Sequence, residues 1–306
     1  MTIPADFSDG DSFVERLQTI YGDMHAEAIL ERMGQPDTQV CFWVNPLIAP
    51  MDTPDGRPVP HVAGLYCSED RTAVTHSAAA EAGAIYVQNA SSFYAVGVLD
   101  PQPGEEILDL AAAPGGKSIA IAARMQNQGR LAVVEPVRSR FHRLQHNLQR
   151  CGVTMAASYR RDGREVGRAV GERFDRVLLD APCSSEARMR WFDPSSYRHW
   201  QLRKVKEASR KQKALIRSAY AALKPGGCLL YSTCSFASEE NELIVSHLLK
   251  RTDAELLPIV PTSGCSIPGL TAYNGRAFPE ALALTLRIVP DALWDGFYMA
   301  LFKKPG

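Results

Sequence analysis

Hydrophobic positions fall into short runs and helical stripes that alternate from about residue 106 onward. The short apolar runs predict strands at residues 106–110, 131–135, 155–160, 174–180 and 228–234. Apolar residues spaced three and four apart predict helices at residues 118–125, 137–151, 195–223 and 239–250. Residues 284–289 and 296–303 predict a closing hairpin, and Pro and Gly predict a turn at 224–227 and a loop at 258–279. This alternation indicates an α/β fold whose parallel sheet is covered by helices on both faces.

The N-terminal part of the chain has a different pattern. Residues 11–34 carry Phe13, Leu17, Ile20, Tyr21 and Met24 at helical spacing, with a break expected at Gly22 before a second helix that includes Ala28, Ile29 and Met33. Residues 39–45 read as a strand, and five prolines between residues 46 and 60 mark an irregular segment. We therefore expect a small α+β unit at residues 1–78, followed by the main α/β domain at residues 79–306.

The turn after the first strand of the main domain is the first candidate binding site. It comprises Ala111, Ala112, Ala113, Pro114, Gly115, Gly116 and Lys117. A phosphate-binding P-loop would need Gly where Ala111 stands, and the dinucleotide fingerprint Gly-x-Gly-x-x-Gly is absent. The alternatives that remain are a tight turn without a ligand and a site for a smaller, adenosine-containing cofactor above bare backbone.

Acidic residues follow each of four predicted strands. Asp109, Glu135, Asp162 and Asp180 stand at or just after the carboxyl ends of these strands. Ligands bind at this edge of a parallel sheet, and a carboxylate after the second strand is suited to hold ribose hydroxyls. The four acids together favour a nucleoside cofactor over chance loop acids.

Charge is unevenly distributed although the formal net charge is zero. Residues 124–224 hold 23 Lys and Arg against 9 Asp and Glu, a net charge of +14, and the densest stretch runs from Arg198 to Arg217. Such a stretch is either a solvated helix surface or a face for a polyanion.

Two cysteines follow the last apolar residues of predicted strands, namely Cys183 and Cys234. A cysteine is most often a small buried hydrophobe, but a thiol at this edge can act as a nucleophile where its pKa is lowered. The chain has seven cysteines and no Cys-x-x-Cys motif, so we expect no disulfide framework and no metal site. No apolar run is long enough to span a membrane, and the polar first residues do not resemble a signal peptide, so we expect a cytoplasmic protein.

Three motifs together resemble a known family. Leu108-Asp-Leu-Ala-Ala-Ala-Pro-Gly-Gly-Lys-Ser, Leu179-Asp-Ala-Pro-Cys-Ser and Tyr231-Ser-Thr-Cys-Ser occur in that order, as in the NOL1/NOP2/sun family of S-adenosylmethionine-dependent RNA cytosine-C5 methyltransferases. The resemblance covers roughly residues 85–303 and implies a Rossmann-like methyltransferase domain. It also implies a single-stranded or loop cytosine in RNA as the target, because the base must leave its stack.

The resemblance assigns roles to individual residues. Ala111 to Lys117, Glu135, Asp162 and Asp180 would line the S-adenosylmethionine site, with Glu135 on the ribose and Asp162 near the adenine. Cys234 would attack C6 of the cytosine, Asp180 would hold its N3/N4 edge, and Cys183 would assist loss of the C5 proton and release of Cys234. We expect the N-terminal unit and the basic stretch from Arg198 to Arg217 to bind RNA.

One departure from the family pattern lies just after Cys183. The family commonly has Gly after Pro-Cys-Ser and another soon after, whereas this chain has Ser185-Glu186-Ala187.

Ribosomal RNA, with the ribosomal subunit as a possible partner, is the first expected substrate, and transfer RNA is the alternative. A non-catalytic RNA-binding or assembly protein, and a DNA methyltransferase that would use Cys183 as its nucleophile, are the other readings.

Overall fold

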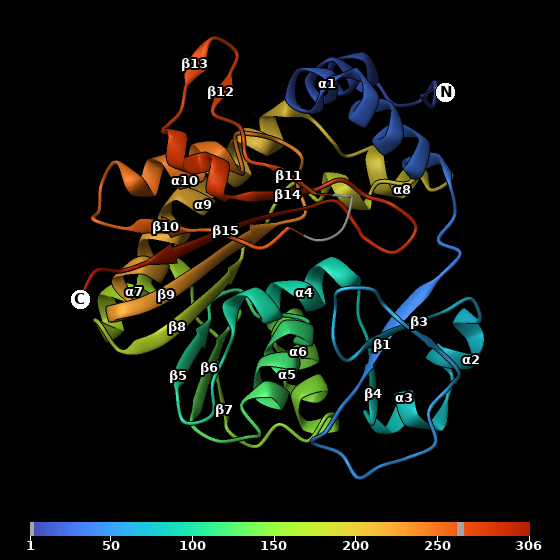
Figure 1. The fold of residues 1–306 in the computed structure, drawn as a ribbon, viewed down its shortest axis with the longest axis vertical. Helices are drawn as coiled ribbons and strands as arrows, with labels where there is room; N and C mark the ends of the chain where they lie inside the picture. The colour runs from blue at the N-terminus through green and yellow to red at the C-terminus, as the bar shows by residue number, and fades with distance from the viewer. Residues whose placement is uncertain (1–2, 262–265) are drawn as a thin grey trace.

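A central sheet with helices on both faces forms the main body of the computed structural model, which describes residues 3–261 and 266–306 (Figure 1). Within these residues the strand order is β11-β14-β15-β9-β8-β5-β6-β7, with β10 beside β15. The parallel strands are β5 (Glu106–Asp109), β6 (Arg130–Val134), β7 (Ala156–Tyr159), β8 (Phe174–Asp180) and β9 (Leu223–Thr233). The antiparallel strands are β10 (Glu255–Leu257), β11 (Ser266–Pro268), β14 (Leu286–Ile288) and β15 (Phe297–Lys303).

Each face of the sheet has its own layer of helices. One layer consists of α4 (Ala90–Leu99), α5 (Gly116–Arg124) and α6 (Arg138–Arg150), and the other of α7 (Gly163–Val170), α9 (Leu202–Ala221) and α10 (Glu242–Leu249) (Figure 1). Neighbouring residues of a strand face opposite sides of the sheet. Ile107 and Leu178 therefore belong to the hydrophobic core under α5, whereas Leu108 and Leu179 belong to the core under α9. The expected α/β architecture is confirmed.

The expected turn at residues 224–227 is a bulge inside β9. Leu223 pairs with Phe174 and Cys228 pairs with Arg176, so four residues of β9 are looped out opposite one residue of β8. The expected loop at residues 258–279 contains β11 and the short hairpin β12 (Ala272–Tyr273) and β13 (Arg276–Ala277), followed by the 3₁₀ turn η2 (Glu280–Leu284). Residues 262–265 of that loop, including Cys265, lie outside the described residues. The closing hairpin is confirmed as β14 and β15.

The N-terminal helix α1 (Gly10–Gly34) packs against the segment that follows β8. Phe13 and Leu17 are buried against Trp191 and Trp200. These two tryptophans belong to the segment after β8, which includes the 3₁₀ turn η1 (Glu186–Arg188) and α8 (Pro194–Tyr197). The break expected at Gly22 is a kink with φ of 71° and ψ of 166°. Because the kink shifts the helical phase, the buried residues beyond it are Ala26, Ile29 and Met33, whereas Met24 and Ala28, expected on the apolar face, are exposed.

A separate four-stranded sheet completes the N-terminal part. Its order is β2-β3-β1-β4, formed by β1 (Val40–Val44), β2 (Arg57–Pro58), β3 (Leu65–Ser68) and β4 (Ile85–Val87), with α2 (Arg71–Thr75) and α3 (Ala78–Ala82) beside it. This sheet lies next to α6 and away from the upper end of α1 (Figure 1). Near the end of α6, the Asn45 side chain donates hydrogen bonds to the carbonyls of Gly83 and Cys151. Strand β4 pairs with β1 although it lies beyond residue 78, so the sheet extends past the domain boundary expected from the sequence.

Candidate active site

A cavity of about 410 Å³ opens at the carboxyl ends of β5, β8 and β9. The turn after β5, the segment after β8 and the residue after β9 all contribute to its wall. Of the residues expected from the sequence, those that line it are Ala111, Ala112, Ala113, Pro114, Gly116, Lys117, Asp180, Cys183 and Cys234. The two candidate cysteines and the candidate cofactor turn therefore share one cavity.

The turn after β5 is fixed by its backbone conformation and by α6. Gly115 caps α5 with φ of 111°, a region that residues with a side chain rarely adopt. The Arg140 guanidinium donates to the carbonyl of Ala113 at 2.8 Å, and the Asn147 amide donates to the carbonyl of Pro114 at 2.8 Å. These contacts turn the carbonyls toward α6.

The sulfur atoms of Cys183 and Cys234 are 3.2 Å apart. The hydrogen bond from Cys183 lowers the pKa of Cys234 to about 7, helped by the Arg188 guanidinium and opposed by burial. The same hydrogen bond, together with burial, raises the pKa of Cys183 well above its usual value. Cys234 is therefore the more acidic of the two thiols, and Cys183 the less acidic.

Asp180 ends β8 beside the thiols and is held by two donors. Lys117 forms an ion pair with it at 2.7 Å, and the Ser232 hydroxyl donates to its other oxygen at 3.0 Å. Lys117 also donates to the Ser92 hydroxyl at 3.2 Å. The carboxylate of Asp180 thus has a fixed position on the cavity wall.

Asp109 also lines this cavity. The sequence indicated it as a strand-end acid but not as a site residue. It is 1% exposed, and its Oδ2 accepts a hydrogen bond from Ser118 at 2.6 Å. Its Oδ1 has no partner among the described residues, and burial raises the pKa of the carboxyl to about 6. Its position at the last residue of a central strand was the available sequence signal.

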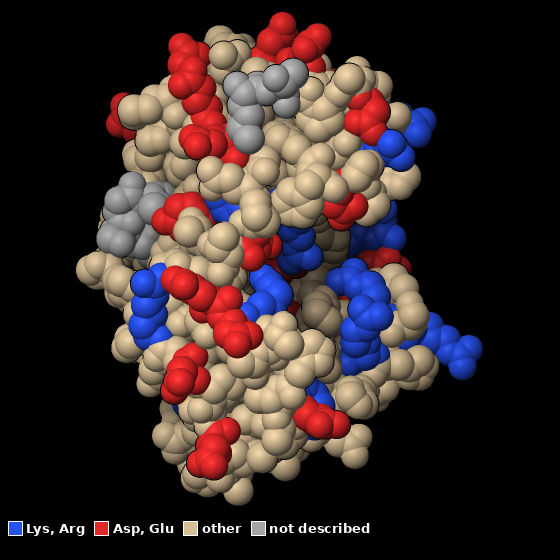
Figure 2. Space-filling view, turned by 90° about the vertical axis from the view of Figure 1, so that its right-hand side faces the viewer, with Lys and Arg blue, Asp and Glu red and all other residues tan. Residues whose placement is uncertain are grey.

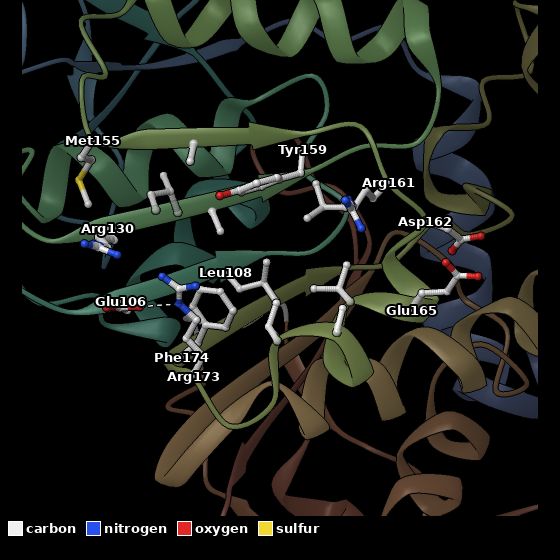
Figure 3. Close-up of a pocket in the computed structure, with 17 residues that line it drawn as sticks. Glu106, Leu108, Arg130, Met155, Tyr159, Arg161, Asp162, Glu165, Arg173 and Phe174 are labelled. Carbon is white, nitrogen blue, oxygen red and sulfur yellow. Dashed lines mark hydrogen bonds and ion pairs between the residues drawn. The ribbon is translucent and has the colours of Figure 1, made fainter.

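Two expected cofactor acids lie outside this cavity. Glu135 is buried, accepts a hydrogen bond from the Val137 backbone N–H at 2.9 Å, and lies 3.5 Å from Arg140, which does line the cavity. Asp162 instead caps α7 and pairs with Arg164 at 2.5 Å, which lowers its pKa. It lines a different cavity of about 580 Å³, between β5, β6, β7 and α7, where Figure 3 shows it beside Glu165 at one end.

Two buried carboxylates join the segments that carry the cysteines, and sequence reasoning missed both roles. Glu240 accepts hydrogen bonds from the Ser184 backbone at 3.0 Å and the Ser235 hydroxyl at 2.8 Å, and burial raises its pKa to about 7. Glu186 accepts from the backbone N–H groups of Phe236 at 2.8 Å and Ala237 at 2.9 Å. The segment after Cys183 is thereby tied to the segment after Cys234.

The basic stretch from Arg198 to Arg217 is not part of the cavity wall. Most of it lies on α9, and the cations that line the cavity are Lys117, Arg140 and Arg188. Lys and Arg side chains gather around a hollow on the face drawn in Figure 2. No group of three or more His, Cys, Asp and Glu suited to a metal ion occurs in residues 3–261 and 266–306, and no helix there is long and apolar enough to cross a membrane.

Comparison with known proteins identifies the family. The family described as 16S rRNA methyltransferase RsmB/F matches residues 96–303. This chain belongs to that family. The resemblance found in the three sequence motifs is confirmed.

Individual relatives agree with this assignment. A tRNA (cytosine(49)-C(5))-methyltransferase from Pyrococcus abyssi is 43% identical over 73% of this chain and 71% of its own length. Ribosomal RNA small subunit methyltransferase F from Vibrio parahaemolyticus is 35% identical over 96% of this chain, which spans 63% of that relative. Counterparts named methyltransferase F from Escherichia coli are 38% identical, and the matched region spans 48% of their length. A solved methyltransferase homologue from Pyrococcus horikoshii superposes with a TM-score of 0.82 at 30% identity, over 99% of this chain and 100% of that one.

Proposed function

We propose that this protein methylates carbon 5 of a cytosine in RNA, with S-adenosylmethionine as the methyl donor. The observation that carries the proposal is the pair of thiols, 3.2 Å apart, at the wall of the cavity that the Ala111–Lys117 turn also lines. The family and its cytosine-C5 relatives support the same chemistry. A scaffold without catalysis would not need a cysteine whose pKa is lowered to about 7.

The residues of the cavity fit a nucleoside cofactor that carries an amino acid. The buried Oδ1 of Asp109 has no hydrogen-bond partner in the described part of the chain and suits an ammonium group. The Ala111–Lys117 turn offers backbone to the ligand, and Glu135 is our proposed partner for the ribose hydroxyls. Asp162 stays a prediction as the residue near the adenine. When bound, S-adenosylmethionine supplies an electrophilic methyl group.

In the proposed mechanism Cys234 is the nucleophile. Its thiolate forms a bond to C6 of the cytosine, and the displaced electron pair makes C5 electron-rich. Asp180, held by Lys117, is positioned to bind the N3/N4 edge of the base, where its carboxylate accepts a hydrogen bond from the N4 amino group and orients the ring.

Cys183 acts after C5 has been methylated. Bond formation removes the negative charge of Cys234, which is one cause of the raised pKa of Cys183. Cys183 can then lose its proton to water in the cavity, and the resulting thiolate takes the proton from C5. The electrons of the C5–H bond restore the ring double bond, and the bond between C6 and Cys234 breaks.

The RNA and its binding faces are also proposals. Ribosomal RNA, free or in the small subunit, is the first proposed substrate because of the relatives named methyltransferase F. Transfer RNA is the second, because of the relative that acts on it. We propose that the N-terminal elements and the basic residues of α9 bind the RNA around the cavity. A cytoplasmic location fits cysteines that form no disulfide among the described residues.

The test is to trap the covalent intermediate. Cys183→Ala is incubated with S-adenosylmethionine and, in parallel, 16S rRNA, assembled small subunits and total tRNA, and the products are separated on a denaturing gel. We expect a protein–RNA band with one of these RNAs, because the variant forms the bond to C6 but cannot release it. Sequencing of the attached RNA names the nucleotide.

The double variant Cys183→Ala/Cys234→Ala is the matched control and should give no band. Cys234→Ala alone should lose methyl transfer. Full methyl transfer by Cys234→Ala together with none by Cys183→Ala would reverse the roles of the two thiols. A wild-type protein that neither binds S-adenosylmethionine nor methylates any of the three RNAs would contradict the proposed enzyme.

A further inference from the structure

Ser185 occupies a strained backbone position beside the two thiols. Its φ of 59° and ψ of 33° lie in the left-handed region, which costs a residue with a side chain roughly 1 kcal/mol or more. Its hydroxyl lies 3.9 Å from the sulfur of Cys183, and the residue lines the cavity. A glycine at this position would adopt the same conformation without strain. The serine therefore provides a hydroxyl beside the thiols at a cost in stability.

Arg188 lies three residues further along the same segment and also lines the cavity. It is exposed, its backbone N–H donates to the carbonyl of Ser185 at 2.9 Å, and its guanidinium forms no hydrogen bond or ion pair with another residue within 3–261 or 266–306. Arg190, in contrast, is half-buried and forms ion pairs with Asp37 at 3.2 Å and Asp295 at 3.3 Å. Arg190 therefore holds the segment in place, whereas the charge of Arg188 is available to the cavity.

We propose that Ser185 and Arg188 are positioning residues for the thiol pair, with the Ser185 hydroxyl beside the sulfur of Cys183 and the Arg188 charge in the same cavity favouring the thiolate of Cys234. The inference rests on the proposed function of Cys234 as the nucleophile. It assigns a purpose to the strained position of Ser185 and to the unpaired side chain of Arg188.

The other charges around Cys234 show why the thiolate needs this support. The Asp180 carboxylate, which ends β8, opposes the negative charge on Cys234, and burial opposes it as well. The amine of Lys117 on α5, which lines the same cavity, is already paired with Asp180. From the segment after β9, the Glu240 carboxylate raises the pKa of Cys183, so it also disfavours a second negative charge in the pair.

The groups that favour the thiolate come from one segment. Cys183 contributes a hydrogen bond at 3.2 Å, Arg188 an electrostatic attraction, and Ser185 a hydroxyl that lies 3.9 Å from the sulfur of Cys183, and all three lower the pKa of Cys234. Conversely, the Cys234 thiolate is the largest cause of the raised pKa of Arg188. The two groups therefore stabilise each other's charged form.

Thiol alkylation tests the inference without RNA or cofactor. The full-length protein is treated with iodoacetamide between pH 5.5 and 9, and the rate of modification at Cys234 is measured by peptide mass spectrometry. We expect Arg188→Gln to raise the midpoint of the pH–rate curve by roughly 0.5–1 pH unit, and Ser185→Gly by a smaller amount. Arg188→Lys should restore most of the shift, because it keeps the charge. Arg203→Gln, an exposed charge removal on α9, is the control and should leave the midpoint unchanged.

Misfolding is separable from these effects. Ser185→Gly relieves the left-handed strain and should melt at a higher temperature than the wild type, so a shifted midpoint in that variant cannot come from unfolding. Unchanged midpoints in both Arg188→Gln and Ser185→Gly would overturn the inference. Failure of the proposed function has a different signature, namely retained methyl transfer by Cys234→Ala, whatever the alkylation curves show.

Discussion

At the scale of the residue, Asp109 combines a cost in stability with a place in the binding cavity. It ends β5, is 1% exposed, and keeps one carboxylate oxygen without a partner among the described residues. Burial raises its pKa from 3.8 to about 6. The folded protein therefore holds the proton of Asp109 more tightly than the unfolded chain does. As the pH rises from about 4 to 6, ionisation of Asp109 progressively lowers the free energy of unfolding, and above that range this loss of stability is constant.

Asp109→Asn should remove this penalty. We expect the variant to be more stable than the wild type at pH 8 by roughly 2–3 kcal/mol, following from about two units of pKa shift, and nearly equal to it at pH 4. The amide oxygen can still accept the hydrogen bond from Ser118. Urea unfolding at a series of pH values measures the difference, with the exposed Asp55→Asn as the control.

The same variant should bind S-adenosylmethionine at least tenfold more weakly by calorimetry, because a neutral amide cannot pair with an ammonium group. A gain in stability that is the same at pH 4 and pH 8 would contradict the assigned cause. Unchanged cofactor affinity would remove Asp109 from the binding site.

The sequence predicted some residue positions well and others poorly, for a physical reason. Cys183 and Cys234 could be predicted as neighbours because both follow adjacent parallel strands, and their sulfur atoms are 3.2 Å apart. Asp162 also follows a strand, and its carboxylate caps α7 and pairs with Arg164, contacts that strand position does not reveal. Its expected place near the adenine stays a prediction. The burial of Glu186 depends on donors some fifty residues away, such as the Phe236 backbone, so no local pattern could indicate it.

At the scale of the element, α7 and α9 touch through a glycine. A Cβ atom at Gly167 would lie 2.1 Å from the backbone oxygen of Ser218. The Ser218 hydroxyl accepts a hydrogen bond from the Gly167 N–H at 2.8 Å and donates to the carbonyl of Gly163 at 2.6 Å. The backbones of the two helices are therefore in close contact, and the Ser218 hydroxyl connects them by hydrogen bonds.

Gly167→Ala should force these helices apart. We expect a loss of roughly 2–3 kcal/mol in the free energy of unfolding, the usual scale for overpacking of a tight contact. Arg168→Ala, on the exposed side of the same helix, is the matched control and should change stability by less than about 0.5 kcal/mol. Chemical denaturation of the two variants measures the difference. Equal stabilities would mean that the helices can separate freely at this point.

Element types were easier to predict than the contacts between elements. The strand at β8 was predicted with its observed bounds, Phe174–Asp180, because an apolar run buried on both faces is a strong local signal. Strand β4 was assigned to the main domain, yet its three residues pair with β1. A segment of this length carries too little pattern to name its partner strand. In α1 the break at Gly22 was predicted but the change of helical phase beyond it was not, because phase depends on the kink geometry.

At the scale of the whole molecule, the positive charge is divided between two places. Lys117, Arg140 and Arg188 line the cavity, where the proposed chemistry needs them. The exposed cations of α9, which include Lys204, Arg210 and Lys211, lie outside its wall. The first group can contact only a few nucleotides near the target. If α9 also binds RNA, it must do so through phosphates more distant from the cytosine.

Salt dependence measures how many phosphates α9 neutralises. For single-stranded RNA, each neutralised phosphate contributes a slope of about −0.7 to the plot of log affinity against log salt concentration. The triple variant Lys204→Gln/Arg210→Gln/Lys211→Gln should therefore reduce the steepness of the slope by up to about 2 if all three residues contact phosphates.

Because these side chains lie outside the cavity, the pH midpoint of Cys234 alkylation should not change, and the methylation rate at saturating RNA should stay close to that of the wild type. Fluorescence anisotropy at several salt concentrations gives the slope. A slope equal to that of the wild type would leave α9 as a solvated surface and would place RNA recognition on the cavity rim and the N-terminal sheet.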